Sequence, residues 1–176
     1  MLLKKMIHPD LKTLDGKAFE RIAARAIILK DHQILLLYTK RYDDYSFPGG
    51  GVDQKEDIIQ GLTRELEEEI GAVAYEIKSM LGEIEEYRPY FDENYDYMHM
   101  VSHYFICELT GPLNKPKLED YEIKNGMVPR WINLDEAIAH NEKLMADKPR
   151  HMGFSVERET YILKKIKSMQ EETHET

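Results

Sequence analysis

The chain has 176 residues, of which 42% are hydrophobic, and a formal net charge of −9. This length fits one compact domain with a sizeable core, and the acidic balance disfavours binding to long DNA or RNA. Cys107 is the only cysteine, which excludes an internal disulfide, and we expect it to be a small buried side chain in a strand. The amino terminus lacks the apolar stretch of a signal peptide, and no apolar run approaches the roughly 20 residues of a membrane span. We therefore expect a cytoplasmic protein.

The first predicted elements are two strands that form a hairpin. Segments 19–30 and 33–39 are rich in β-branched and aliphatic residues and flank the turn-like stretch 30–32. An extended piece, 46–48, then enters Gly49-Gly50-Gly51. Three successive glycines indicate a loop in which the backbone comes close to another group or takes a positive φ.

A helix is predicted after this glycine loop. Asp53 is a plausible N-cap, with Glu56 at the reciprocal position of a capping box, and Gly71 is expected to end the helix. Its apolar stripe comprises Ile59, Leu62, Leu66 and Ile70.

The remaining elements alternate between strands and helices. We predict strands over 72–88, 99–109 and 128–132, and helices over 134–146 and 155–170. Asn133 or Asp135 would cap the first of these helices, and the tail 171–176 is expected to be frayed. Interleaved strands and helices favour an α/β layered domain with a mixed sheet.

Three carboxylates gather on the helix that follows the glycine loop. At 100° per residue, Glu65, Glu68 and Glu69 fall within an arc of about 100° beside the apolar stripe, so they should be partly desolvated. Like charges at this spacing repel one another, and a divalent cation would turn the repulsion into coordination. A solvated acidic helix face is the alternative reading of the three glutamates alone.

The residues around the carboxylates make the motif specific. The stretch resembles the Nudix box, with every fixed position filled at the family's spacing: Gly50, Glu56, Arg64, Glu65, Leu66, Glu68, Glu69, Gly71 and Ala72. Phe47-Pro48-Gly49-Gly50 before the box and Trp131-Ile132 after it extend the resemblance to about residues 20–165. The resemblance implies an α/β/α sandwich in which the box forms a loop–helix–loop, within a single domain over 1–176 that has a short N-terminal extension.

The resemblance also implies a reaction. Nudix proteins typically hydrolyse a nucleoside diphosphate linked to another group, by water attack at phosphorus with Mg²⁺ or Mn²⁺. Glu68 and Glu69 match the metal-ligand positions, and Glu65 is a third ligand or the base. Arg64 belongs to the same catalytic set, where it and Glu56 would hold loop and helix in place. A backbone carbonyl of Gly49 or Gly50 could complete the metal shell, and the alternative bases are Asp92, Glu93, Asp96, Glu119 and Glu122.

Substrate recognition is less specified. Lys40, Arg41 and Arg88 are candidate phosphate contacts, with ordinary surface cations as the competing reading, and Tyr90 belongs to an aromatic segment that could stack on a nucleobase or pack on the sheet edge. We expect a small nucleoside diphosphate-linked substrate, no long nucleic acid and no membrane, and leave a homodimer open. The alternative function is a catalytically weak Nudix-fold protein that senses nucleotides or acts as a scaffold.

Overall fold

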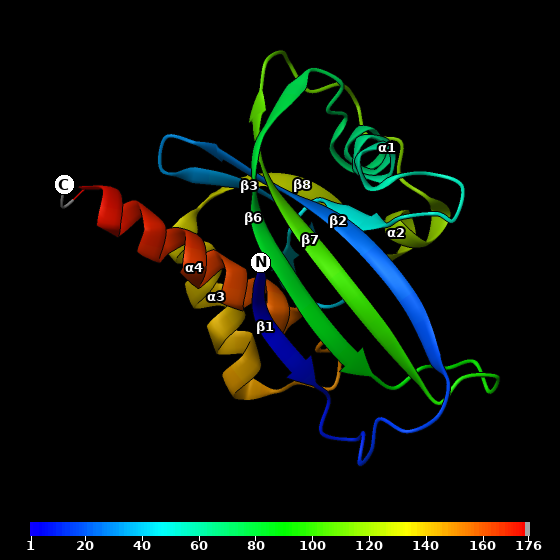
Figure 1. Cartoon of the computed structure of the whole chain (residues 1–176). Coiled ribbons are helices and arrows are strands. Elements are labelled where there is room, and N and C mark those ends of the chain that lie inside the picture. The colour runs from blue at the N-terminus through cyan, green and yellow to red at the C-terminus, as the bar shows by residue number, and fades with distance from the viewer. Residues whose placement is uncertain (175–176) are drawn as a thin grey trace.

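A computed structural model describes residues 1–174 and shows a mixed sheet with helices on both faces (Figure 1). The strands are β1 (Leu2–Ile7), β2 (Ala18–Lys30), β3 (Gln33–Thr39), β4 (Asp44–Ser46), β5 (Gly49–Gly51), β6 (Tyr75–Arg88), β7 (Tyr97–Leu109) and β8 (Met127–Asn133). The helices are α1 (Ile58–Ile70), α2 (Asp120–Asn125), α3 (Leu134–Asp147) and α4 (Val156–His174). The predicted α/β sandwich with a mixed sheet is confirmed.

The strands follow the order β1-β6-β7-β2-β3-β4, with β5 paired to β2 and β8 to β3. β1 runs parallel to β6, and β2 parallel to β7, whereas the other pairs are antiparallel. The predicted hairpin is confirmed by the pairs Leu29↔Ile34 and Lys30↔Gln33. β5 brings the glycines onto β2, where Arg25 pairs with Gly49.

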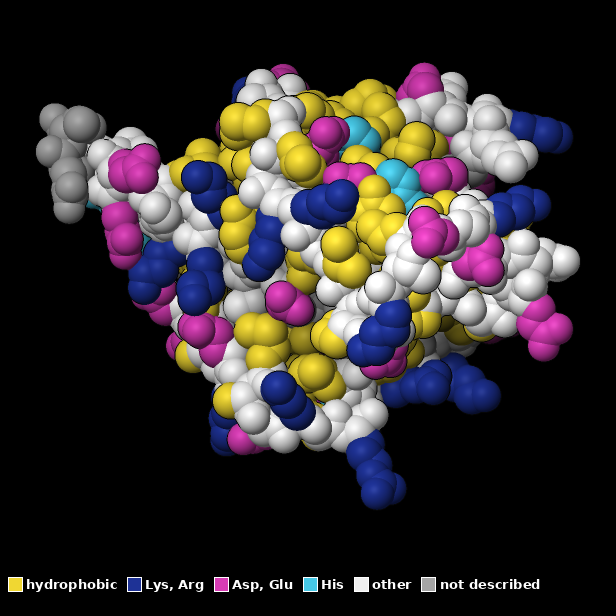
Figure 2. All heavy atoms as spheres, turned by 60° about the horizontal axis from the view of Figure 1, so that its bottom comes forward, with side chains coloured by type: hydrophobic (Ala, Val, Ile, Leu, Met, Phe, Trp, Pro, Cys, Tyr) yellow, Lys and Arg dark blue, Asp and Glu magenta, His cyan; other side chains and the backbone are white. Residues whose placement is uncertain are grey.

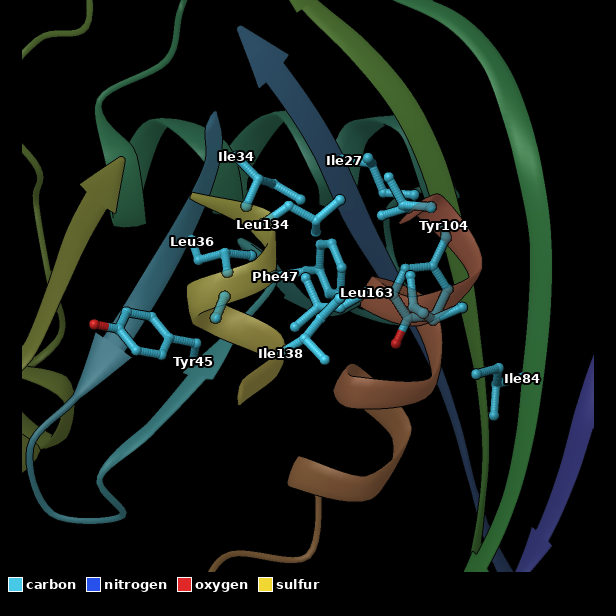
Figure 3. Packing of buried hydrophobic residues seen from close by; sticks show 13 residues of the cluster. Ile27, Ile34, Leu36, Tyr45, Phe47, Ile84, Tyr104, Leu134, Ile138 and Leu163 are labelled. Atoms are coloured by element: carbon cyan, nitrogen blue, oxygen red, sulfur yellow. The ribbon is translucent and has the colours of Figure 1, made fainter. Parts of the chain in front are cut away.

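Two hydrophobic clusters lie on opposite faces of the sheet, because successive side chains of a strand alternate between its faces. Ile27 of β2 packs under α3 and α4, whereas Ala26 and Ile28 pack under α1. In the first cluster, side chains of α3 and α4 point towards Phe47 and Tyr104, whose rings meet edge to face at 5.5 Å (Figure 3). Cys107 is buried in β7 beneath α1, as predicted.

Several element boundaries differ from the sequence prediction. Residues 2–7, placed outside the core by sequence, form β1 at the edge of the sheet, and the short helix α2 was not predicted. α4 continues to His174, so residues 171–174 of the expected frayed tail are helical, while the rest of that tail lies outside the described residues. Asn133, rather than Asp135, caps α3 by accepting hydrogen bonds from two backbone amides. No helix within residues 1–174 is both long and apolar enough to cross a membrane.

Candidate active site

Helix α1 begins four residues later than the Asp53 cap predicts. Asp57 is the N-cap and forms a reciprocal capping box with Gln60. The side chain of Glu56 does accept the predicted reciprocal hydrogen bond from the Asp53 amide, at 2.9 Å, and it is also bound by Arg64. Because α1 begins at Ile58, Glu56 lies in the loop that precedes the helix, and its carboxylate connects that loop to Arg64.

The apolar face of α1 fixes the helix on the sheet. Leu62, Leu66 and Ile70 are buried, as predicted, and pack against the β2 face that carries Ala24. Ile59 is 41% exposed, so its assignment to the stripe was wrong. The predicted end is confirmed, since Gly71 takes a left-handed conformation at φ 66°. With the helix held in this orientation, the carboxylates beside its apolar face lie next to the glycine loop.

Glu69 is the most buried of the three carboxylates. Only 5% of the residue is exposed, and its Oε2 accepts a hydrogen bond from the Gly49 amide at 2.7 Å. Burial, reinforced by the nearby charge of Glu65, raises the pKa of the Glu69 carboxyl well above its usual range. Gly49 can approach because it has no Cβ: at φ 129°, an added Cβ would lie 2.1 Å from the Ala24 carbonyl oxygen.

Glu65 faces the next glycine of the same loop. A Cβ added to Gly50 would lie 2.7 Å from Glu65 Oε1, so the absence of a side chain leaves room for the carboxylate. The Glu65 side chain is 15% exposed, and burial raises its pKa. Glu68, at 30% side-chain exposure, lies at the outer edge of the group. The expectation of a partly desolvated carboxylate cluster is confirmed.

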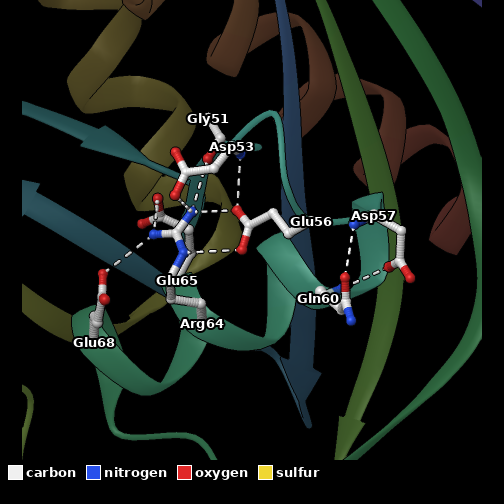
Figure 4. Close-up of polar contacts among 8 residues, drawn as sticks. All are labelled: Gly51, Asp53, Glu56, Asp57, Gln60, Arg64, Glu65 and Glu68. Carbon is white, nitrogen blue, oxygen red and sulfur yellow. Dashed lines mark hydrogen bonds and ion pairs between the residues drawn. The ribbon is translucent and has the colours of Figure 1, made fainter.

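Arg64 links the loop to the helix (Figure 4). Its guanidinium donates to Glu56 at 2.7 and 3.2 Å and to the Gly51 carbonyl oxygen at 3.0 Å. The other side of the guanidinium reaches Glu65 at 3.0 Å and Glu68 at 3.5 Å. Glu56 foremost, and Glu65 with it, raises the pKa of Arg64, while Arg64 lowers the pKa of Glu56. Arg64 therefore neutralises part of the carboxylate cluster and tethers it to the loop.

The donor set fits a hard divalent cation in its chemistry. Carboxylate oxygens and backbone carbonyls are the ligands that Mg²⁺ and Mn²⁺ prefer, and the mutual repulsion of Glu65 and Glu69 is what a cation relieves. Within residues 1–174, however, no three Asp, Glu, His or Cys side chains already converge as a metal-binding group. Arg64 is the counter-ion of Glu65 and Glu68 in this arrangement, so a metal would have to share or replace its contacts.

Among the downstream acids proposed as bases, Glu122 has the clearest relation to the cluster. It is 3% exposed at the start of α2, and its charge acts on both Glu65 and Glu69. Glu119 is the N-cap of α2. Asp92 and Glu93 lie in the β6–β7 loop, where Asp96 accepts a hydrogen bond from the Lys17 amide.

A cavity of about 540 Å³ adjoins the carboxylates, and we call it the arginine pocket. Both Gly49 and Glu69 contribute to its wall. Its other sides come from β2, β6, the β6–β7 loop and the segment before α4, and its charged and aromatic residues include Arg21, Arg25, Arg88, Arg158, Tyr42, Tyr90, Phe91 and Phe154. The box and a cavity large enough for a small molecule thus share a wall.

Two of the four predicted substrate contacts line the arginine pocket and two do not. Arg88 and Tyr90 line the arginine pocket, whereas Lys40 and Arg41 are absent from its lining. Arg41 donates to Asn125 at 3.1 Å instead. Sequence reasoning missed Arg21 and Arg25, although their spacing of four residues in a strand puts both on one face.

A buried charge network supports the back of the pocket. Arg158, 1% exposed, pairs with Glu86 at 2.6 Å and with Glu159 at 3.2 Å, and its Nε donates to the Tyr104 hydroxyl. The Tyr104 hydroxyl donates in turn to Glu159 at 2.8 Å. Arg25 reaches Glu159 only at 3.7 Å, and its buried Nε has no hydrogen-bond partner among residues 1–174. The network fixes α4 on the sheet and leaves Arg25 incompletely satisfied beside the glycine loop.

Two histidines of β7 pair with carboxylates of the neighbouring strands on one face of the sheet. Nδ1 of His99 lies 2.6 Å from Glu20 and its Nε2 lies 2.9 Å from Glu85, while His103 lies 3.4 Å from Glu83. Figure 2 likewise shows histidine side chains next to Asp and Glu side chains on this face.

Comparison with known proteins agrees with the geometry. The NUDIX domain family model matches residues 20–152. Diphosphoinositol polyphosphate phosphohydrolase 3-alpha of Mus musculus is 28% identical over 148 residues, which cover 81% of this chain and 80% of the relative.

Solved structures share the fold. A MutT NUDIX hydrolase from Burkholderia pseudomallei aligns with a TM-score of 0.53 at 20% identity, covering 81% of this chain and 97% of that one. A NUDIX hydrolase from Nitrosomonas europaea aligns with a TM-score of 0.54 at 20% identity, covering 70% of this chain and 79% of that one. The chain therefore belongs to the NUDIX family and is a Nudix pyrophosphohydrolase.

Proposed function

We propose that the protein cleaves the pyrophosphate linkage of a nucleoside diphosphate or triphosphate derivative, by water attack at phosphorus with Mg²⁺ or Mn²⁺. The observation that carries the proposal is the position of Glu69. This box carboxylate and Gly49 form part of the wall of a cavity that also contains four arginines. Such a cavity offers cations to the phosphates and places their linkage next to the box.

The proposal gives each box residue a role. Glu68 and Glu69 would hold the metal, with Glu65 as a third ligand or as the base that takes a proton from water. Bound metal would neutralise charge on the diphosphate and make hydroxide available near neutral pH. Arg64 and Glu56 position the carboxylates, because Arg64 contacts Glu65, Glu68 and the loop carbonyl of Gly51. A backbone carbonyl of Gly49 or Gly50 would complete the metal shell, since no Cβ obstructs its approach.

Two candidates remain for the base: Glu65 or a downstream acid. Among the downstream acids Glu122 is favoured, because its charge acts on Glu65. Replacing the base removes the acid limb of the pH–rate profile, whereas replacing a metal ligand mainly raises the metal concentration needed for activity. Glu65→Gln and Glu122→Gln, compared in these two measurements, separate the roles.

The aromatic side of the pocket supports a substrate with a planar group. Tyr42, Tyr90, Phe91 and Phe154 all line it, and aromatic rings stack on nucleobases. A second candidate substrate is a diphosphoinositol polyphosphate, because the curated relatives carry that activity in their names. The same bond would be cleaved, but the substrate would have no base to stack.

The test is a substrate panel with Mg²⁺ or Mn²⁺, followed by ³¹P NMR in ¹⁸O-labelled water. The panel contains nucleoside triphosphates, dinucleoside polyphosphates, nucleoside diphosphate sugars and a diphosphoinositol polyphosphate. We expect turnover of at least one nucleotide, with ¹⁸O in a phosphate product. Binding without product across the panel would favour the sensing or scaffold alternative instead.

A matched pair of variants tests the box. Glu69→Gln should lose most activity and keep the fold, since glutamine can still accept the hydrogen bond from the Gly49 amide. Glu67→Gln is the control, because Glu67 is on the same helix but its carboxylate contacts, in the described part of the chain, only the exposed Lys117, at 2.9 Å. Unchanged turnover in Glu69→Gln would refute the proposed metal site.

A further inference from the structure

Three arginines of the pocket lie on one face of the sheet. Arg21 and Arg25 are four residues apart on β2, next to the glycine loop, and a Cβ on Gly51 would meet the Arg21 guanidinium at 2.8 Å. Arg88 lies on β6, which is separated from β2 by β7. Two strand spacings put the Arg88 backbone about 10 Å from that of β2. The cations therefore extend from the box across the pocket.

Arg88 lacks a counter-ion of its own. Within residues 1–174, its side chain makes no ion pair and no hydrogen bond, and its guanidinium lies 5.9 Å from the Phe154 ring centroid. The carboxylate that attracts it, Glu86, is bonded to Arg158 at 2.6 Å. Arg21 likewise makes no ion pair in the described part of the chain.

Burial makes this deficit costly. Burial lowers the pKa of Arg88 to about 10; the charge of Glu86 opposes this, while the charges of Arg158, Arg25 and Arg21 add to it. Arg88 is still charged at neutral pH. A cation held in these surroundings gains a great deal from an incoming anion.

The arginines next to the box and Arg88 stand at different distances from the bond to be cleaved. Arg21 and Arg25, beside Gly49 and Gly51, are placed for the diphosphate itself. Building on the proposed function, we infer that Arg88 binds a second anionic group of the substrate, a phosphate monoester that is remote from the diphosphate and is not hydrolysed. Substrates with this extra phosphate are preferred over otherwise identical ones without it.

The rings around Arg88 favour a phosphate carried on a nucleotide. Phe91 is 88% exposed and Phe154 is 58% exposed at the pocket, so both keep exposed ring surface although Phe91 also contacts Tyr90 and Phe154 contacts His8. Tyr90 is in addition stacked on Phe19 at 4.5 Å. A planar base would cover the exposed rings while its phosphate reaches Arg88. An inositol ring would bring phosphates but nothing to cover these rings.

The experiment measures binding to two matched pairs of probes without divalent cation, so that no turnover occurs. The pairs are dephospho-coenzyme A with coenzyme A, and ADP-ribose with ADP-ribose 2′-phosphate; each pair differs by one ribose phosphate. The wild-type protein should bind the member with the extra phosphate roughly tenfold more tightly in at least one pair. Arg88→Gln should abolish this preference, because it weakens binding of the member with the extra phosphate roughly tenfold more than binding of the other member.

Two further variants complete the design. Arg88→Lys keeps the charge and should retain part of the preference, and Lys164→Gln is a control for loss of one positive charge on the exposed surface of α4. Equal affinities in the wild type, no binding of either member, a preference that survives Arg88→Gln, or an equal loss for both members would each overturn the inference. Hydrolysis of the same probes with Mg²⁺ tests the proposed function separately. Turnover without a binding preference would support the proposed function and refute the inference about Arg88, whereas a binding preference without turnover would do the reverse.

Discussion

Replacing Glu56 by glutamine tests how the box is held together. Glu56 Oε1 accepts from Arg64 Nη2 at 2.7 Å and Oε2 accepts from Arg64 Nε at 3.2 Å, while the Glu56 side chain is only 16% exposed. Glutamine can replace Oε1, but its amide NH₂ would face the Nε–H donor. The variant therefore loses one hydrogen bond and the charge of the other.

The expected loss of unfolding free energy is about 1–2 kcal/mol, because hydrogen bonds to charged groups contribute about 1.5–3 kcal/mol and Arg64 remains partly exposed. For a chain of this size that lowers Tm by roughly 2–8 °C. A second effect follows from the geometry: Arg64, released from Glu56, can pair more strongly with Glu65 and Glu68. We therefore expect the metal concentration for half-maximal activity to rise roughly tenfold, as for other groups that orient metal ligands.

The assay is urea denaturation at several pH values, with Glu67→Gln as the control. Arg64 lowers the pKa of Glu56, so the stabilisation is fully present above the ordinary carboxyl pKa and is lost as the pH falls through the lowered one. The difference in stability between wild type and Glu56→Gln should therefore shrink towards acid pH. Equal losses in Glu56→Gln and Glu67→Gln at pH 7 would refute the reasoning.

Other parts of the structure give further predictions. Gly49→Ala should cost about 3 kcal/mol or more in urea unfolding, because its Cβ would strike the Ala24 carbonyl at φ 129°, whereas Gly153→Ala, with no neighbour nearer than 3.6 Å, should cost far less. Burial raises the pKa of Asp44 to about 6, so wild-type stability should fall as the pH rises from about 4 to 6. Asp44→Asn should remove up to about 3 kcal/mol of that decline, and an unchanged pH profile would contradict the assignment. Arg158→Met should lower the unfolding free energy by about 3–5 kcal/mol, since the buried Glu86 loses its partner and the buried Glu159 loses one of its contacts; a loss below 1 kcal/mol in thermal and urea unfolding would show that the network is not stabilising.

The sequence by itself determined the chemistry of the box. Spacing put Glu65, Glu68 and Glu69 beside the apolar stripe, and Gly71 marked the end of the helix, because helical periodicity and a left-handed cap are local properties. The alternating strands and helices likewise indicated a layered α/β fold. Local pattern failed at the start of α1, where it favoured Asp53 over Asp57. Glu56, the expected partner of that cap, is also bound by Arg64 eight residues further along the chain. Sequence spacing does not show such a tertiary contact.

Only the tertiary structure decided what surrounds the box. β1 joins the sheet through backbone hydrogen bonds to β6, and such pairing between segments about 80 residues apart leaves no periodic signal in the sequence. Arg21, Arg25 and Arg88 line the same pocket because β2 and β6 flank β7 in the sheet. The sequence thus determined the family of the chain and the residues of the box, since these lie within one helix and loop. The folded sheet decided which charges line the arginine pocket beside the box, since those come from strands distant in the chain.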